Sequence, residues 1–315
     1  MNKSSNQWLL FGLVAGAFGG LLAQLQRSAT TRQWSGAQWR NGPGRALITG
    51  ASAGIGAEFA RQLARAGYHL VLTARREERL RTLAEEIQAR FPVQVEVLPA
   101  DLDEPRDLER LEERIRALDD LTLLVNNAGF GAGGGFARNP AKPELKMIRV
   151  HVLASVRLAR AVLPGMLDRG HGAIINVSSM AGFVPMPGSA TYGATKAYLN
   201  SFSETLRVEL AGSGVRVQAL CPGMTHTELH QAAGLREARI PRIAWMTAEY
   251  VVAESLKGLR ENRTVVVPGL LYKILYLVAN SLLGARLIRL GMEMGIVRRV
   301  IDNTRGGDKQ AEVTG

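Results

Sequence analysis

The sequence contains a single cysteine, Cys221, among its 315 residues. One thiol excludes an intramolecular disulfide bond. It also argues against a zinc site, which usually needs several cysteine and histidine ligands at fixed spacing. We therefore expect no metal in this protein.

Acidic residues are also in the minority, because 28 Asp and Glu stand against 39 Lys and Arg, for a net charge of +11. Such an excess can accompany nucleic-acid binding or attraction to anionic lipid. The sequence has no helix-turn-helix, RRM or zinc-finger signature, so we expect no nucleic-acid partner. Two interpretations of the charge stay open, an arginine-rich solvated surface and attraction to a membrane.

Residues 1–44 differ in composition from the middle of the chain. Trp8 to Leu25 form an apolar run that only Gln24 interrupts. As a helix, this run would span roughly 27 Å, which is enough for a bilayer core. Arginines follow it, and the positive-inside rule then places the rest of the chain in the cytoplasm. We predict a membrane anchor at residues 8–25 and a polar linker; a packed or peripheral helix and a cleaved signal peptide are the alternatives.

Residues 270–315 form a second apolar extension. The segment from Leu270 to Ile301 is punctuated by five cations: Lys273, Arg286, Arg289, Arg298 and Arg299. This pattern is typical of a helix that lies in a membrane interface with its cations toward the headgroups. A helix that covers the substrate pocket or contacts a second subunit fits equally well. Residues 305–315 are predicted to be a disordered tail.

Residues 45–269 alternate short apolar runs with helical patterns. The runs RALIT, HLVLTA, VQVEVLP, LTLLVN, GAIINVS, VRVQAL and TVVVP are predicted to be seven strands. Several are continuously apolar, as expected for a parallel sheet that is buried on both faces. The alternation predicts a single α/β domain with a doubly wound parallel sheet of the Rossmann type. Ligands of such sheets bind at the carboxyl ends of the strands.

A glycine-rich turn joins the first predicted strand to the helix that follows it. The residues that we expect to contact a cofactor there are Gly50, Ser52, Ala53, Gly54, Ile55 and Gly56. The glycines permit a tight turn and a close approach of a pyrophosphate, which the free N–H groups of the helix N-terminus can bind. A glycine-rich turn between a strand and a helix therefore predicts a dinucleotide site.

The end of the second strand favours NADP(H) over NAD(H). An acidic residue usually holds the ribose 2′-hydroxyl of NAD here, but this sequence has Ala74 followed by Arg75 and Arg76. A guanidinium group suits a 2′-phosphate, and Ser52 adds a hydroxyl. A solvated helix residue is the alternative interpretation of Arg76. Two polar residues follow the third and fourth strands, where the adenosine half would rest: Asp101 and Asn127.

A tyrosine and a lysine four residues apart open a long helical pattern. Tyr192 and Lys196 share one face of that helix, and Ser179 ends the strand before it. A nearby ammonium group favours the phenolate, so we expect Lys196 to bring the pKa of Tyr192 toward neutrality. The loop from Ser179 is long enough to bring its hydroxyl beside the phenol, where it can hydrogen-bond a substrate oxygen.

Taken in order, these motifs resemble those of the short-chain dehydrogenase/reductase family over residues 45–270. Three later residues belong to the same pattern: Pro222, Gly223 and Thr227. The resemblance implies that Tyr192 is the acid–base, that Lys196 binds the nicotinamide ribose, and that Ser179 steadies the carbonyl. It also implies that Pro222, Gly223 and Thr227 hold the nicotinamide end. Many members are dimers or tetramers, so a homo-oligomer is compatible with this sequence.

One position departs from the family pattern. His151 stands where many members have an asparagine that supports a proton-relaying water. A histidine can donate and accept hydrogen bonds and can titrate near neutral pH, so we interpret His151 as a catalytic relay residue. A packed helix histidine is the alternative. The relay hypothesis predicts that His151→Asn retains activity.

The sequence also resembles a bacterial branch that includes membrane-associated reductases of long-chain, mycolate-type ketoacyl lipids. This resemblance implies a lipophilic or acyl-lipid ketone as substrate. The segment between Pro222 and Met246 is predicted to form a lid, and six of its side chains either line an apolar site or pack on the domain: Leu229, Ala232, Ala233, Leu235, Ile240 and Trp245. A dehydrogenase of steroids, retinoids or small alcohols is one alternative, and a non-catalytic NADP-binding sensor or scaffold is another.

Overall fold

The computed structural model of the chain describes residues 44–293, except 132–135, 138 and 229–241. The described residues belong to one compact unit. The predicted anchor at 8–25, the tail at 305–315 and most of the predicted lid lie outside the described residues.

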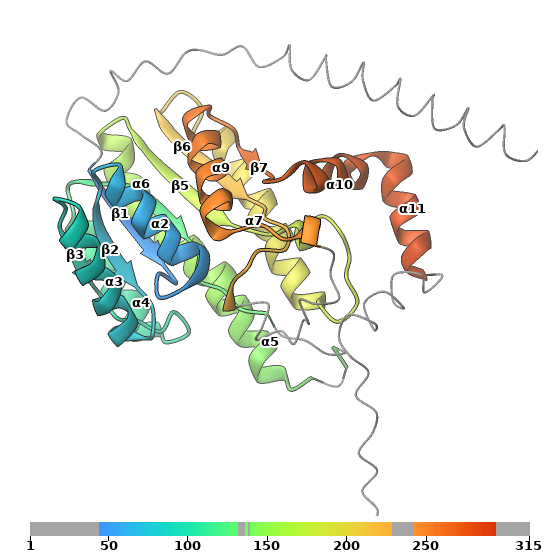
Figure 1. Cartoon of the computed structure of the whole chain (residues 1–315), viewed down its shortest axis with the longest axis horizontal. Helices are drawn as coiled ribbons and strands as arrows, with labels where there is room; N and C mark the ends of the chain where they lie inside the picture. The colour runs from blue at the N-terminus through green and yellow to red at the C-terminus, as the bar shows by residue number, and fades with distance from the viewer. Residues whose placement is uncertain (1–43, 132–135, 138, 229–241, 294–315) are drawn as a thin grey trace, which may run out of the picture. The chain divides into compact units, whose positions relative to one another are not determined.

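The sheet has seven strands in the order β3-β2-β1-β4-β5-β6-β7, and every pair of neighbours is parallel (Figure 1). The strands are β1 (Arg45–Thr49), β2 (His69–Thr73), β3 (Val95–Val97), β4 (Leu121–Asn126), β5 (Gly172–Val177), β6 (Val215–Leu220) and β7 (Val265–Val266). Each falls within one of the seven predicted runs. The predicted doubly wound parallel sheet is therefore confirmed.

Helices cover both faces of the sheet, because successive side chains of a strand point to opposite sides. In β1, Ile48 packs into one apolar cluster and Leu47 into the other. The first cluster is closed by α2 (Gly54–Arg65), α3 (Glu77–Arg90) and α9 (Ala248–Arg260). The second is closed by α4 (Pro105–Arg116), α6 (Ala154–Asp168) and α7 (Ala190–Glu209).

The shorter elements complete the layers. Helix α5 (Ala141–Ile148) runs through a π-helical segment, η2 (Arg149–Leu153), directly into α6. Two 3-10 turns lie beside the carboxyl edge of the sheet: η3 (Met180–Gly182) after β5, and η5 (Arg242–Ala244) before α9. A bridge between Thr225 and Met246 joins the two ends of the segment that contains η5.

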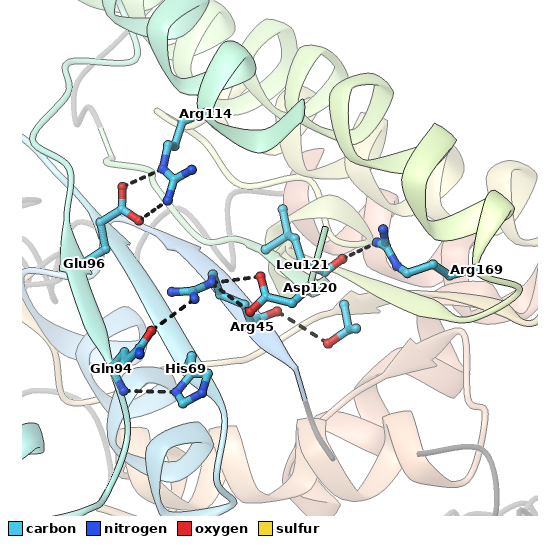
Figure 2. Close-up of polar contacts among 9 residues, drawn as sticks. Arg45, His69, Gln94, Glu96, Arg114, Asp120, Leu121 and Arg169 are labelled. Atoms are coloured by element: carbon cyan, nitrogen blue, oxygen red, sulfur yellow. Dashed lines mark hydrogen bonds and ion pairs between the residues drawn. The ribbon is translucent and has the colours of Figure 1, made fainter. Parts of the chain in front are cut away.

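Polar contacts fix the amino edge of the sheet, away from the strand ends that bind ligands in such folds (Figure 2). The guanidinium of Arg45 donates to Asp120, just before β4, at 3.0 Å. The backbone N–H of Gln94 donates to Nδ1 of His69 at 3.0 Å, which ties the start of β3 to β2. These contacts join the beginnings of four strands at the edge of the sheet opposite the predicted ligand site.

The C-terminal extension forms two helices, α10 (Leu270–Asn280) and α11 (Leu282–Glu293), that meet at an angle of 100°. We expected one helix, and the break has a local cause. Ser281 has an extended backbone, and its hydroxyl accepts the N–H of Gly284 at 3.0 Å, which is the geometry of a helix N-cap.

Among the described helices, one continuous run is long and apolar enough to cross a membrane, Ala141–Asp168. Half of its apolar window is buried inside the domain, so we assign it to the core between α4 and α7. The bent pair of α10 and α11 passes the same test only when the two helices are taken together.

Candidate active site

The carboxyl ends of the strands surround a cavity of about 370 Å³. It lies at the switch point between β1 and β4, where this type of sheet binds its ligands. Most of the predicted site residues line it: Gly50, Ser52, Ala53, Gly54, Ile55, Arg75, Asp101, Asn127, Ser179, Tyr192, Lys196, Pro222, Gly223 and Thr227. Gly56 and His151 are not among the lining residues. The fold thus brings the predicted cofactor residues and the predicted catalytic residues to one cavity.

The turn after β1 has the shape of a diphosphate cradle. Gly50 and Gly54 have φ angles of 66° and 56°, in the left-handed region that favours glycine. A Cβ at Gly50 would lie 2.8 Å from Cα of Ala128, and a Cβ at Gly56 would collide with the carbonyl oxygen of Gly50. Helix α2 begins at Gly54, so its free N–H groups start at the cavity. The residues present therefore fit the pyrophosphate of a dinucleotide.

Asn127 supports this turn from the end of β4. Its side-chain amide donates to the carbonyl oxygens of Thr49 and Gly50 at 2.9 and 3.2 Å. In return, the hydroxyl oxygen of Thr49 accepts the backbone N–H groups of Asn127 and Ala128, both at 2.9 Å. Asn127 was predicted as a cofactor contact, and the structure adds that it fixes the shape of the cradle.

The ends of β2 and β3 form the far end of the cavity. Arg75 is 65% exposed and lies 3.9 Å from the carboxylate of Asp101. Arg76 makes more contacts than Arg75. Its Nε and Nη2 donate to the hydroxyl of Ser52 at 3.2 and 3.1 Å. Its Nη1 donates to Glu228 at 2.8 Å. This arrangement of two arginines and a serine fits a 2′-phosphate.

Three further charged residues belong to this end of the cavity, and the sequence analysis did not identify them. Lys146 donates to Asp101 at 3.1 Å and lines the cavity. Glu228 also lines it, and Arg79 donates to the carboxylate of Glu228 at 2.5 Å. Glu228 directly follows Thr227, and this position next to a predicted cofactor residue is the one feature of the sequence that could have identified it.

Ser179, Tyr192 and Lys196 meet at the other end of the cavity. Ser179 follows β5 and caps η3, where its hydroxyl accepts the N–H of Ala181 at 3.1 Å. Tyr192 lies in the first turn of α7, and Lys196 lies one turn further along the helix. The ammonium group of Lys196 is 5.6 Å from the centre of the Tyr192 ring and donates to the carbonyl oxygen of Val177 at 2.8 Å.

Burial dominates the pKa values of both ionisable groups. It raises the pKa of Tyr192, and a hydrogen bond with Ser179 only partly opposes this. Burial also lowers the pKa of Lys196 to about 8. The expectation that the pKa of Tyr192 moves toward neutrality is therefore wrong, because burial disfavours the phenolate. Tyr192 is protonated at neutral pH.

His151 lies beside Tyr192, with 5.9 Å between ring centres, in the π-helical segment η2, and is 1% exposed. Its Nε2 accepts the backbone N–H of Phe130 at 3.0 Å, and its Nδ1 lies 2.9 Å from the hydroxyl of Thr195. Burial and the charge of Lys196 hold its pKa well below the usual 6.5, so the ring is neutral. Both ring nitrogens thus contact protein atoms, which favours a positioning role over the water-holding relay that the sequence predicted.

Two tyrosines of α10 contact the loops beside the predicted catalytic residues. The ring of Tyr276 packs edge-on against Phe183 with 4.8 Å between ring centres. The hydroxyl of Tyr272 donates to the carbonyl of Ala244 at 2.7 Å and accepts the N–H of Met224 at 2.9 Å. Helix α10 therefore joins the segment after β6 to η5.

The predicted lid is described only in part. Trp245 stacks on His226 with 4.7 Å between ring centres, while the other predicted lid residues lie outside the described residues.

Comparisons with known proteins agree with this geometry. The sequence profile described as short chain dehydrogenase matches residues 45–238. A sulfoacetaldehyde reductase from Chromohalobacter salexigens is 42% identical over 188 residues, which cover 58% of this chain and 72% of that protein. A very-long-chain 3-oxoacyl-CoA reductase from Aspergillus clavatus is 38% identical over 177 residues, which cover 55% of this chain and 51% of that protein.

Among solved structures, a short-chain dehydrogenase from Sphingobium yanoikuyae in complex with NADPH is similar over 86% of this chain and 98% of its own. The TM-score is 0.69 at 36% sequence identity.

Proposed function

Because the chain belongs to the short-chain dehydrogenase family and is an oxidoreductase that acts on CH–OH groups, we propose that it reduces lipophilic ketones with NADPH at a membrane surface. The observation that carries the proposal is the meeting of Ser179, Tyr192 and Lys196 at one end of a cavity whose other end has the shape of a dinucleotide site. The structural neighbour with bound NADPH supports the cofactor.

NADP(H) binding assigns a role to each part of the cavity. The cradle formed by Gly50, Gly54 and the start of α2 would hold the pyrophosphate. Arg76 and Ser52 would hold the 2′-phosphate. The bound cofactor supplies a hydride to the carbonyl carbon, and the protein supplies the proton and the electrostatic environment.

The proton comes from Tyr192. Its raised pKa keeps the phenol protonated at neutral pH, which is the form that a reductase needs to protonate the developing alkoxide. Ser179, which hydrogen-bonds Tyr192, is placed to donate to the same oxygen as negative charge develops. The buried ammonium group of Lys196 stabilises that charge from behind, and its bond to Val177 keeps it in place.

The lipophilic substrate class is supported by the C-terminal helices and by one relative. Helices α10 and α11 carry large apolar side chains that are mostly exposed: Leu270, Leu271, Ile274, Leu282, Leu283, Leu287 and Leu290. Tyr276 of α10 packs on Phe183, three residues after Met180 of η3, which supports a substrate site next to α10. The Aspergillus relative, of which this chain spans about half, reduces very-long-chain 3-oxoacyl-CoA.

The membrane location is proposed from both extensions. The apolar run at 8–25 would anchor the chain, with the catalytic domain in the cytoplasm. The exposed leucines of α11 would dip into the acyl region while Lys273 and Arg286 meet the headgroups. A lipid ketone would then reach the cavity from the bilayer, and the substrate would need no transfer through water.

NADPH oxidation by the full chain in phospholipid vesicles tests the proposal. The panel would run from sulfoacetaldehyde and short diketones to long-chain 3-ketoacyl lipids, with Tyr192→Phe as the matched control. We expect turnover that rises with chain length and is abolished in the variant. Equal turnover of short soluble carbonyls would reject the lipid substrate but keep the enzyme class. No Tyr192-dependent turnover despite NADPH binding would favour the sensor or scaffold.

A further inference from the structure

Glu228 places a carboxylate at the end of the cavity that fits a phosphate. It lies in the segment after β6 and lines the cavity together with Ser52, Arg75 and Arg76. Its two carboxylate oxygens are both used, since one accepts from Arg76 at 2.8 Å and the other from Arg79 at 2.5 Å. These arginines hold the pKa of Glu228 below its usual range, so the group is ionised at neutral pH.

The guanidinium of Arg76 has its donors occupied on two sides. Nε and Nη2 donate to Ser52, while Nη1 donates to Glu228. A phosphate that needs the Nη1 donor must therefore displace the carboxylate. If Glu228 stayed in place, the carboxylate and the phosphate would compete for Arg76 at close range, which costs free energy through like-charge repulsion.

The contact between Arg76 and Glu228 lies beside the glycine-rich turn after β1. A Cβ at Gly54 would be only 3.0 Å from the side chain of Thr227, so the residue next to Glu228 sits on the phosphate-binding turn. Glu228 is 152 residues from Arg76 in sequence, and the pair joins the segment after β6 to the start of α3. The pair therefore lies at the end of the cavity that would receive the 2′-phosphate.

We propose that Glu228 is an internal competitor of the cofactor's 2′-phosphate and sets how strongly the protein prefers NADP(H). With the site empty, the carboxylate holds Arg76 and Arg79 together. When NADP(H) binds, Arg76 exchanges the carboxylate for the 2′-phosphate. Glu228 thereby weakens the binding of cofactors that carry a 2′-phosphate. It leaves the binding of cofactors with a free 2′-hydroxyl unchanged. This inference rests on NADP(H) binding and is independent of the substrate.

Binding of 2′,5′-ADP, NADPH and NADH to the full chain, measured by calorimetry without any substrate, tests the proposal. Glu228→Gln keeps the size of the side chain and removes the charge. We expect Kd for 2′,5′-ADP and NADPH to fall about threefold to fivefold, the range that exposed ion pairs contribute, while Kd for NADH stays unchanged. Unchanged or weaker binding of 2′,5′-ADP would overturn the proposal. Weaker NADH binding would show that Glu228 binds the ribose hydroxyl instead.

Two control variants separate the specific contact from a general change in charge. Glu77→Gln removes an equal charge from the first turn of α3, where Glu77 pairs with Arg81 and does not line the cavity. We expect it to leave all three Kd values unchanged. In an Arg76→Gln background, the effect of Glu228→Gln should shrink by at least half, because the competition acts mainly through Arg76. A full effect there would contradict the proposal. Because no turnover is measured, these outcomes are independent of the proposed reaction.

Discussion

His151 and Thr195 are joined across the interior, with 2.9 Å between Nδ1 of the ring and the threonine hydroxyl. Thr195 donates its own hydroxyl proton to the carbonyl of Tyr192 at 2.8 Å, so the imidazole Nδ1 is the donor in this pair. Nε2 is then free of a proton and accepts the N–H of Phe130. One neutral ring thus links the loop after β4 to the helix that carries Tyr192.

We expect His151→Asn to retain most of the activity. An asparagine amide reaches the position of Nδ1 and can keep the bond to Thr195, but it is too short to reach Phe130. His151→Leu should be worse, with stability lowered by about 1 to 3 kcal/mol, because it removes both the acceptor of the Phe130 N–H and the donor to the Thr195 hydroxyl. Thermal unfolding and kcat of both variants check this. Loss of activity to background in the asparagine variant alone would contradict it.

The pH profile should lack a histidine step. The pKa of His151 lies well below 6.5 because burial disfavours the cation, so the ring does not titrate between pH 6 and 8. Lys196 has a pKa of about 8, and its ammonium group is lost above that value. We therefore expect the reduction rate to be flat from pH 6 to near 8 and to fall at higher pH. Initial rates with saturating NADPH measure this, and a rise in rate through pH 6 to 7 would argue for a titrating His151.

The reverse reaction should depend on pH in the opposite sense. Alcohol oxidation needs the phenolate of Tyr192, and burial raises the pKa of that phenol. The phenolate fraction therefore increases with pH throughout the alkaline range. We expect the rate of alcohol oxidation with saturating NADP+ to increase from pH 7 to 10, and the Tyr192→Phe variant to show no oxidation at any pH. An oxidation rate of the unchanged protein that stays constant over this range would show that Tyr192 is not the acid–base.

Lys196 should affect stability in a pH-dependent way. Its pKa is about 8 in the folded protein, against 10.5 for the ordinary value, so the unfolded chain binds more protons between these two values. Stability contributed by this group therefore increases as pH rises from about 8 to 10.5. The stability of the wild type relative to Lys196→Met should increase by about 2 to 3 kcal/mol between pH 7 and 10.5. Urea unfolding at the two pH values checks this, and a constant difference would contradict it.

Tyr272 should be needed for both stability and cofactor binding. Its hydroxyl connects Ala244 with Met224, and its ring lies where a Cβ at Gly223 would collide with it. Tyr272→Phe keeps the ring but leaves these two backbone groups without that partner, which should cost about 1 to 2 kcal/mol. We also expect a higher KM for NADPH. Tyr272 binds the backbone of Met224, and the preceding residue, Gly223, lines the cavity. Tyr250→Phe, on an exposed side chain of α9, is the matched control and should change neither quantity.

Local patterns were sufficient to predict the sheet and the position of the cavity. Apolar runs such as Leu121–Asn126 are buried on both faces, so their hydrophobicity alone marks them as strands. The glycine-rich turn and the pair of Tyr192 and Lys196 are each visible as a short local motif. The order of the strands in the sheet then brings the two motifs to one cavity.

Contacts between distant residues could not be predicted in this way. The partners of His151 are 21 and 44 residues away, and Glu228 meets Arg76 only after β6 has been placed in the sheet. The pKa of Tyr192 was predicted in the wrong direction because the sequence gives the spacing of Lys196 but not the depth of burial. The break at Ser281 was missed because a single serine cap within an apolar segment is a weak signal.

Transfer of deuterium tests the central claim most directly. NADPH that carries deuterium at the reactive C4 position would be incubated with the vesicle-bound full chain and either a long-chain 3-ketoacyl lipid or a short soluble ketone. The account predicts one deuterium at the new carbinol carbon of the long-chain product, little product from the short ketone, and none from either substrate with Tyr192→Phe. Labelled product that forms equally well in the Tyr192→Phe variant, or only from the short ketone, would contradict it.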